Sequence, residues 1–128
     1  SNGCLALILL LDQMTRNIYR DTPKAFAGDE IACALSLRAA ADQTIERQES
    51  EAKRQFFLMP MMHSEDIAIQ ENSLPLFKKH TAARTYDYAI RHRDIIARFG
   101  RFPHRNAILG RPSTAEETEF LAGPNSSF

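Results

Sequence analysis

The sequence predicts an all-α protein, and two observations carry the prediction. Apolar residues recur at helical spacing, most clearly over residues 81–99, where Tyr88, His92, Ile95 and Phe99 follow one another at intervals of three and four. No segment shows a sustained alternation with a period of two, so we expect few or no strands. Short connections between successive helices favour antiparallel hairpins, stacked as a bundle or a solenoid.

The predicted helices cover residues 3–20, 29–42, 48–62, 64–79 and 81–99, followed by a short helix after residues 113–114. The first helix is apolar on all sides over its front half, which predicts a central place in the core. Pro60 is expected to end or kink the third helix. Ser64 is the expected N-cap of the fourth helix, and Gly100 the expected stop of the fifth.

The segment between the last two helices, residues 101–112, contains Gly110 and two prolines and is predicted as an extended loop outside the core. A capping box should begin the last helix, formed either by Ser113 with Glu116 or by Thr114 with Glu117. Residues 125–128 are expected to be frayed.

Length and charge limit the classes of protein. The 128 residues suffice for a single domain, 1–128, with an ordinary apolar core. Lys plus Arg and Asp plus Glu both number 16, and a net charge of zero argues against a nucleic-acid binder. The longest apolar run, residues 4–11, is too short for a membrane span, which needs about 20 residues. Cys4 and Cys33 are expected as small buried hydrophobes, which indicates reduced thiols and a cytoplasmic location.

The chain begins almost inside its longest apolar run, with only Ser1 and Asn2 before Gly3 and Cys4. We therefore expect the chain to be truncated at its N-terminus. A first helix with part of its apolar surface exposed favours a homodimer, because helical arrays often pair through such faces.

Polar residues concentrate in three blocks at predicted helix ends. The blocks are Asp12, Gln13, Arg16 and Asn17; then His63, Glu65, Asp66 and Gln70; then His92, Asp94, Arg98, Arg101, His104, Arg105, Asn106 and Arg111. Burying such groups without partners costs about 1–3 kcal/mol each. The blocks must therefore pair with one another, cap helices or face a cleft.

Three segments of the chain resemble the family called domain of unknown function 924. They are residues 10–17 (LLDQMTRN), 57–66 (FLMPMMHSED) and 92–106 (HRDIIARFGRFPHRN). The resemblance implies a tetratricopeptide-like bundle or short superhelix, a further N-terminal stretch, and one common polar feature made by the three blocks. It implies no activity. The family pattern has proline where this chain has Thr15, so the first helix should run on to Arg16 or beyond.

One hypothesis is a binding module in which the three blocks meet in one cleft. Its arginines would receive a carboxylate or phosphate of a small anionic ligand or peptide, because guanidinium groups match these anions in a bidentate geometry. The predicted ligand-binding residues are Asp12, Gln13, Arg16, Asn17, Glu65, Asp66, Gln70, Arg98, Arg101, Arg105 and Asn106.

A second hypothesis is a hydrolase-type enzyme, and a third is a purely structural network. In the enzyme, His63, His92 or His104 acts as general base, oriented by Asp66, Asp94 or Asp12, while arginines stabilise an oxyanion. In the structural network, the blocks form buried ion pairs and caps that fix the register of the helices. The sequence contains no metal-binding or nucleotide-binding motif, so neither a metal nor a cofactor is predicted.

Overall fold

The structure, a computed structural model, describes residues 2–20, 22–26 and 28–126, with the backbone alone at positions 2, 15 and 16. Its elements are α1 (Asn2–Ile8), the π-helical segment η1 (Leu9–Met14), α2 (Thr15–Ile18), the 3-10 turn η2 (Pro23–Phe26), α3 (Asp29–Ala41), α4 (Glu51–Met62), α5 (Ile67–His80), α6 (Ala83–Phe99), the 3-10 turn η3 (Pro103–Arg105), α7 (Asn106–Leu109) and α8 (Ala115–Leu121). These described residues contain no strand, which confirms the all-α class. None of their helices is long and apolar enough to cross a membrane.

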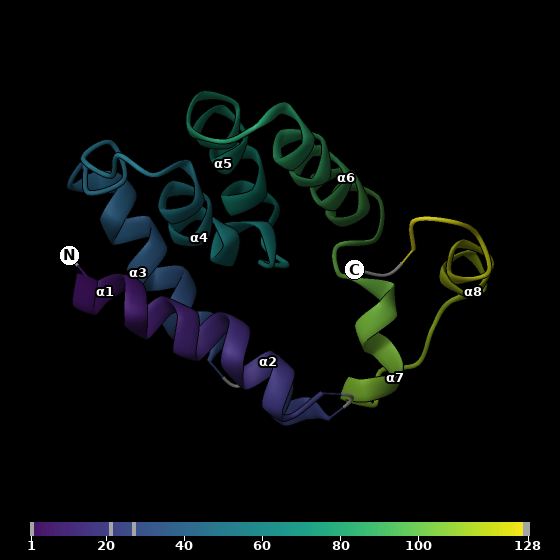
Figure 1. The fold of residues 1–128 in the computed structure, drawn as a ribbon. Helices are drawn as coiled ribbons and strands as arrows, with labels where there is room; N and C mark the ends of the chain where they lie inside the picture. The colour runs from purple at the N-terminus through teal and green to yellow at the C-terminus, as the bar shows by residue number, and fades with distance from the viewer. Residues whose placement is uncertain (1, 21, 27, 127–128) are drawn as a thin grey trace.

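The first three elements form one helical rod that packs against α3 and α4 (Figure 1). The rod continues to Ile18, as the absence of proline at position 15 predicts. The predicted central position in the core is wrong. Ile8 is buried on the inner side, whereas the side chains of Leu7 and Leu10 are 42% and 48% exposed on the outer side.

The middle of this rod, η1, is a π-helix that the sequence did not predict. A π-helix bonds each N–H one residue further back than an α-helix does, so it accommodates an extra residue and redirects the side chains that follow. The backbone of Leu11 in this segment lies directly against Gly28. A Cβ atom at position 28 would stand 2.3 Å from the carbonyl oxygen of Leu11, so only glycine fits there.

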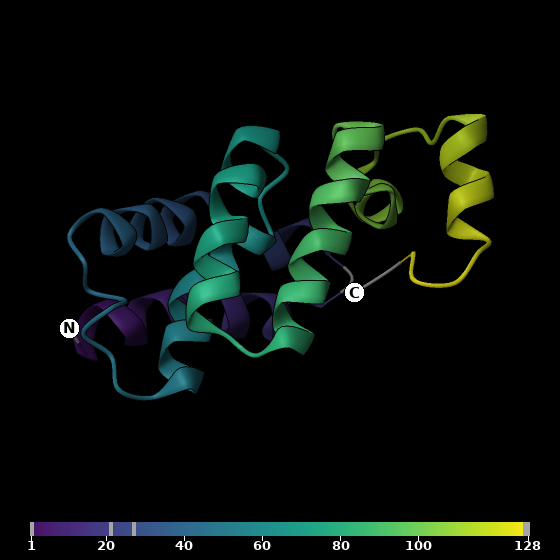
Figure 2. The ribbon, with the colours of Figure 1, turned by 90° about the horizontal axis from the view of Figure 1, so that it is seen from above.

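The helices α3 to α6 pack in chain order, each against the next. Two residues, Thr81 and Ala82, join α5 to α6, so these helices form an antiparallel hairpin and lie side by side in Figure 2. The main core lies among these helices and the rod; it includes Ile8, Ile45, Phe57, Leu58, Met61 and Phe77. Pro60 does not end α4, which continues to Met62.

The corner between α4 and α5 differs from the prediction in its cap. Asp66, rather than Ser64, is the N-cap of α5, and its carboxylate accepts a hydrogen bond from the N–H of Ala68 at 2.9 Å. The hydroxyl of Ser64 accepts from the N–H of Asp66 instead. The helix therefore begins at Ile67, and Glu65 lies before it, where its carboxylate can reach another segment.

The segment after α6 is more structured and more buried than predicted. Gly100 ends α6 with a φ of 72°, as expected. The predicted extended loop instead forms η3 and α7, and Phe102 and Asn106 within it are 0% and 1% exposed. Thr114, not Ser113, forms the capping box of α8. Helix α8 lies at the end of the molecule opposite the N-terminus (Figures 1 and 2).

Replacement of Gly28 by alanine tests the close approach of η1. We expect Gly28→Ala to lower the free energy of unfolding by about 1–3 kcal/mol, because the added methyl group forces the backbone of Leu11 or α3 to shift. The control is Gly3→Ala in α1, where a Cβ meets nothing within 4 Å and the helix should gain up to about 1 kcal/mol. Urea unfolding followed by circular dichroism measures both, and equal midpoints would contradict the packing.

Candidate functional site

A buried carboxylate–imidazole pair joins the rod to the end of α4. Asp12, in η1, is 1% exposed, and its Oδ1 atom accepts a hydrogen bond from Nδ1 of His63 at 2.8 Å. The amide of Gln13 donates to the other carboxylate oxygen at 2.6 Å. Because an ionised carboxylate only accepts, Nδ1 of His63 carries the proton. In the neutral ring, Nε2 then holds the basic lone pair.

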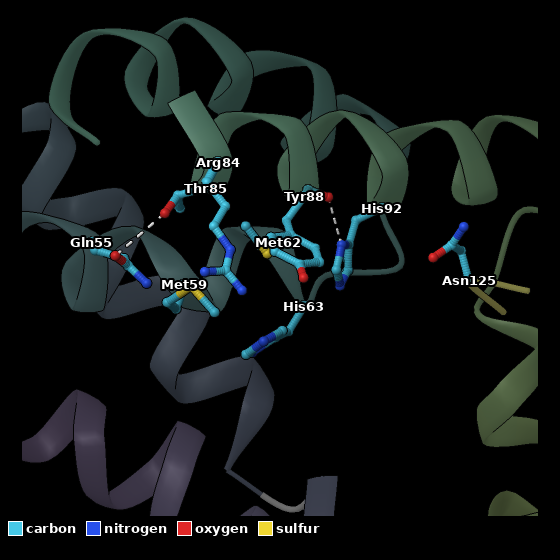
Figure 3. Close-up of a pocket in the computed structure, with 9 residues that line it drawn as sticks. All are labelled: Gln55, Met59, Met62, His63, Arg84, Thr85, Tyr88, His92 and Asn125. Atoms are coloured by element: carbon cyan, nitrogen blue, oxygen red, sulfur yellow. Dashed lines mark hydrogen bonds between the residues drawn. The ribbon is translucent and has the colours of Figure 1, made fainter. Parts of the chain in front are cut away.

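His63 lines a hollow of about 730 Å³ between α4 and α6 (Figure 3). The residues around it are Gln55, Met59, Met62, His63, Arg84, Thr85, Tyr88, His92 and Asn125. A hydrogen bond of 3.4 Å from the Thr85 hydroxyl to the Gln55 side-chain oxygen crosses between the two helices at one end. The hollow therefore combines thioether and aromatic surface with several polar groups.

Arg84 provides the cation of this hollow. Its side chain extends from the first turn of α6 into the hollow, toward Met59 and Met62 (Figure 3). Within the described part of the chain, no acidic side chain pairs with this guanidinium group.

His92 is the second imidazole of the hollow and is kept neutral. The ring is 5% exposed, and burial lowers its pKa to about 4, although a hydrogen bond from Nδ1 to the carbonyl of Tyr88 at 2.7 Å acts in the opposite direction. The nearby His63, whose ring centroid is 6.4 Å away, also disfavours the protonated form. The edge of the His92 ring stands against Phe102. At neutral pH this wall of the hollow carries no charge.

The three polar blocks of the sequence meet around His63. Asp12, from the first block, binds its ring, and Arg105, from the third block, donates to its carbonyl oxygen at 2.9 Å. Glu65, from the second block, accepts from the N–H of Phe102 at 2.6 Å and pairs with Arg111 at 2.9 Å. The corner between α4 and α5 is thus the common centre of all three.

Two arginines of the third block, Arg101 and Arg111, pair with carboxylates of the protein. Arg101 pairs with Glu117 at 2.7 Å and, with the N–H of Thr114, lowers the pKa of that carboxyl to about 2. Burial opposes ionisation of Glu65, but hydrogen bonds from Arg111 and from the Phe102 N–H outweigh it and lower its pKa. These contacts hold η3, α7 and α8 against the α4–α5 corner.

The remaining predicted residues lie in different surroundings. Gln70 is fully buried and donates to the carbonyls of Met62 and Ser64, both at 2.7 Å. Arg98 is exposed and stacks on Phe99. Asn106 donates to Ser113, and His104 packs near the Phe102 ring. Asp94 pairs with Arg93, and Asn17 is exposed. The side chain of Arg16 lies outside the described residues.

Sequence reasoning missed most of the hollow. It singled out His63 and His92 but not the residues beside them, which are Gln55, Met59, Met62, Arg84, Thr85, Tyr88 and Asn125. A usable pattern was present, because Arg84, Tyr88 and His92 repeat at intervals of four on one face of α6. Gln55 and Met59 likewise share a face of α4 and line the hollow, although Met59 also packs against the core.

A second hollow, of about 470 Å³, lies on the α3 side of His63. Its wall includes the acidic residues Asp29, Glu65 and Asp66 and the thiol of Cys33. Burial, followed by the charge of Asp66, raises the pKa of Cys33, so this free thiol is protonated at neutral pH and is a weak nucleophile. Among the residues that the structure describes, no three His, Cys, Asp or Glu side chains are placed to hold a metal ion.

The fold and these contacts define an all-helical domain with a ligand-sized hollow beside a buried Asp–His pair. Residues 1–125 match the model of the family described as "Bacterial protein of unknown function (DUF924)", and the chain belongs to this family. A search of the curated proteins found no significant match.

A solved structure of a protein of unknown function from Agrobacterium tumefaciens is similar to this chain. The two are 42% identical with a TM-score of 0.86, and the match covers 92% of this chain and 66% of the other. The chain thus spans about two thirds of that protein's length. The family and this neighbour support the fold and leave the function unknown.

The neutral state of His92 predicts a dependence of stability on pH. The unfolded imidazole binds a proton near its ordinary pKa of 6.5, whereas the folded one does so only at about 4. The contribution of the neutral His92 ring to the free energy of unfolding is therefore complete above pH 6.5. It is lost as the pH falls from 6.5 toward 4, by up to about 3 kcal/mol. When the pH is lowered from 7.5 to 4.5, the free energy of unfolding of the wild type should fall by about 2–3 kcal/mol more than that of His92→Gln, as measured by urea unfolding. A midpoint of 6.5 or above for His92 in an NMR titration would contradict this.

Proposed function

We propose that the protein binds a small anionic organic ligand in the hollow between α4 and α6. The guanidinium group of Arg84, directed into the hollow with no acidic partner among the described residues, carries this proposal. A guanidinium group binds a carboxylate or phosphate through two parallel hydrogen bonds. An anion is therefore the partner that this side chain fits best.

The lining indicates the rest of the ligand. Met59, Met62 and Tyr88 offer apolar and aromatic surface, which favours an apolar or aromatic body behind the anionic group. Gln55 and His63 add hydrogen-bonding groups at the sides. The volume of about 730 Å³ lies within the range of roughly 300–1,000 Å³ that is usual for small-molecule sites. The hollow thus favours a small molecule over a long peptide.

The place of the anion differs from the sequence-based hypothesis. That hypothesis assigned the anion to Arg16, Arg98, Arg101 and Arg105. Arg101 already pairs with Glu117, and Arg105 donates to the carbonyl of His63 and stacks between Phe26 and Phe102. Their internal partners support a structural role for these two arginines, and the proposed anion site moves to Arg84.

Three further properties stay predictions. A homodimer is supported by an exposed apolar stripe on the rod, formed by Leu7, Leu10, Met14 and Ile18. A tetratricopeptide-like superhelix is supported by the consecutive packing of α3 to α6. The cytoplasmic location rests on the sequence argument from its cysteines.

Binding of simple aromatic anions tests the proposed site. We expect benzoate and phenyl phosphate to shift the NMR signals of Tyr88 and His92, and neutral benzamide to bind at least tenfold more weakly. Arg84→Ala should weaken benzoate at least tenfold, because a hydrogen bond to a charged group contributes about 1.5–3 kcal/mol.

The matched control is Arg93→Ala, which removes the same charge from the same helix at a residue that pairs with Asp94 instead of lining the hollow. This variant should bind benzoate as the wild type does. Equal affinity for benzoate and benzamide, or equal losses in the two arginine variants, would overturn the proposed function.

A further inference from the structure

We propose that Asp12 and His63 form a general-base pair that hydrolyses an ester of an anionic small molecule held in the hollow between α4 and α6. This inference rests on the proposed binding function, because Arg84 would hold the anionic group of the substrate. It is carried by the geometry of the pair and by the position of His63 in the wall of the hollow.

The ring of His63 is held in one orientation from two sides. Its Nδ1–H donates to Asp12 at 2.8 Å, and its backbone carbonyl accepts from Arg105 at 2.9 Å. A buried carboxylate at Nδ1 fixes the tautomer with a basic Nε2 and stabilises the imidazolium that forms when Nε2 takes a proton. Asp12 is therefore a positioning residue, and His63 is the group that would exchange the proton.

The pair consists of a partly accessible ring, that of His63, and a fully buried carboxylate, that of Asp12. The side chain of His63 is 16% exposed and lines the hollow, whereas Asp12 is 1% exposed behind it. Asp12 reaches this position from η1, and π-helical segments often occur at functional sites.

The α6 face supplies the other groups that the reaction needs. Arg84 and Tyr88 are one helical turn apart, and both line the hollow with His63 (Figure 3). Arg84 would bind the carboxylate or phosphate of the substrate. The hydroxyl of Tyr88 is a hydrogen-bond donor that would stabilise the oxyanion developing on the ester carbonyl.

The reaction needs only water as co-reactant. Nε2 of His63 accepts a proton from a water molecule while the water oxygen bonds to the ester carbonyl carbon, which gives a tetrahedral oxyanion. The bond from this carbon to the alcohol oxygen then breaks, and the departing oxygen takes the proton from the His63 imidazolium. The products are the carboxylic acid and the alcohol, and His63 returns to its neutral form.

The test uses 4-acetoxybenzoate, whose hydrolysis to 4-hydroxybenzoate and acetate is followed by ultraviolet absorption. We expect turnover by the full chain above the rate in buffer. His63→Gln should lower kcat by about 10²–10⁴-fold, the usual contribution of a general base, with benzoate affinity within about threefold of the wild type. Asp12→Asn should lower kcat at least tenfold and change its pH profile.

The matched control is His104→Gln, because His104 does not line the hollow. This variant should retain the turnover of the wild type. Imidazole added to His63→Ala should restore part of the rate, which a purely structural loss would not allow. If the His63 variants do not fold, the wild type is labelled with diethyl pyrocarbonate instead. Turnover should be lost as His63 is modified. Benzoate should slow the modification of His63 and the loss of turnover.

The outcomes separate the two proposals. Benzoate binding that depends on Arg84, without hydrolysis of 4-acetoxybenzoate, would overturn the general-base pair and leave the binding function intact. Hydrolysis that persists in His63→Gln, or in protein labelled at His63, would also overturn the pair. Absence of Arg84-dependent benzoate binding would overturn the proposed binding function, and with it the general-base pair that rests on it.

Discussion

The hydrogen bond between Asp12 and His63 is the contact on which the arrangement of this domain depends. A carboxylate that is 1% exposed must be matched by a donor, since an unpaired buried charge is far more costly than a surface one. The match forces the rod, through its π-helical segment, to lie against the end of α4. Gly28 permits this position, because any larger residue would collide with Leu11. One hydrogen bond to a buried carboxylate and the missing side chain of Gly28 thus act, with the apolar contacts of Ile8, to position the N-terminal rod against the other helices.

The same corner is held from the opposite side by the C-terminal segment. Glu65 accepts from the Phe102 backbone and from Arg111, and Arg105 donates to the carbonyl of His63. These charge-assisted contacts act together with the burial of Phe102 against Ile95 and Ile96 to hold the segment in place. Their effect on the hollow is indirect, because Arg105 contacts the backbone of His63, whereas Asp12 contacts its ring. Rigid support of this kind is what a preorganised polar site requires.

Sequence patterns predicted the helices well and the site only in part. Helical periodicity and Gly100 identified α6, since both are local properties of the chain. The π-helix was missed because it depends on the contacts of Asp12 and Gly28 with distant residues. The apolar residues of the rod suggested full burial, but one face remains exposed. Convergence of the polar blocks was one of three hypotheses from the sequence, whereas Arg84 was overlooked because it is a single arginine in an otherwise ordinary helix.

The division of roles among the charged residues explains why the richest polar block is not the proposed site. Arg101 and Arg111 have carboxylate partners within 3 Å, so an incoming anion would have to compete with contacts already made. Arg84 faces no such competition among the described residues, and the neutral His92 in the wall of the same hollow adds no second charge. A cluster of arginines in a sequence can therefore mark internal ion pairs that join segments of the fold, as well as a ligand-binding site. In this protein Arg105 of that block holds the backbone carbonyl of His63, whereas the proposed chemistry uses the ring of His63.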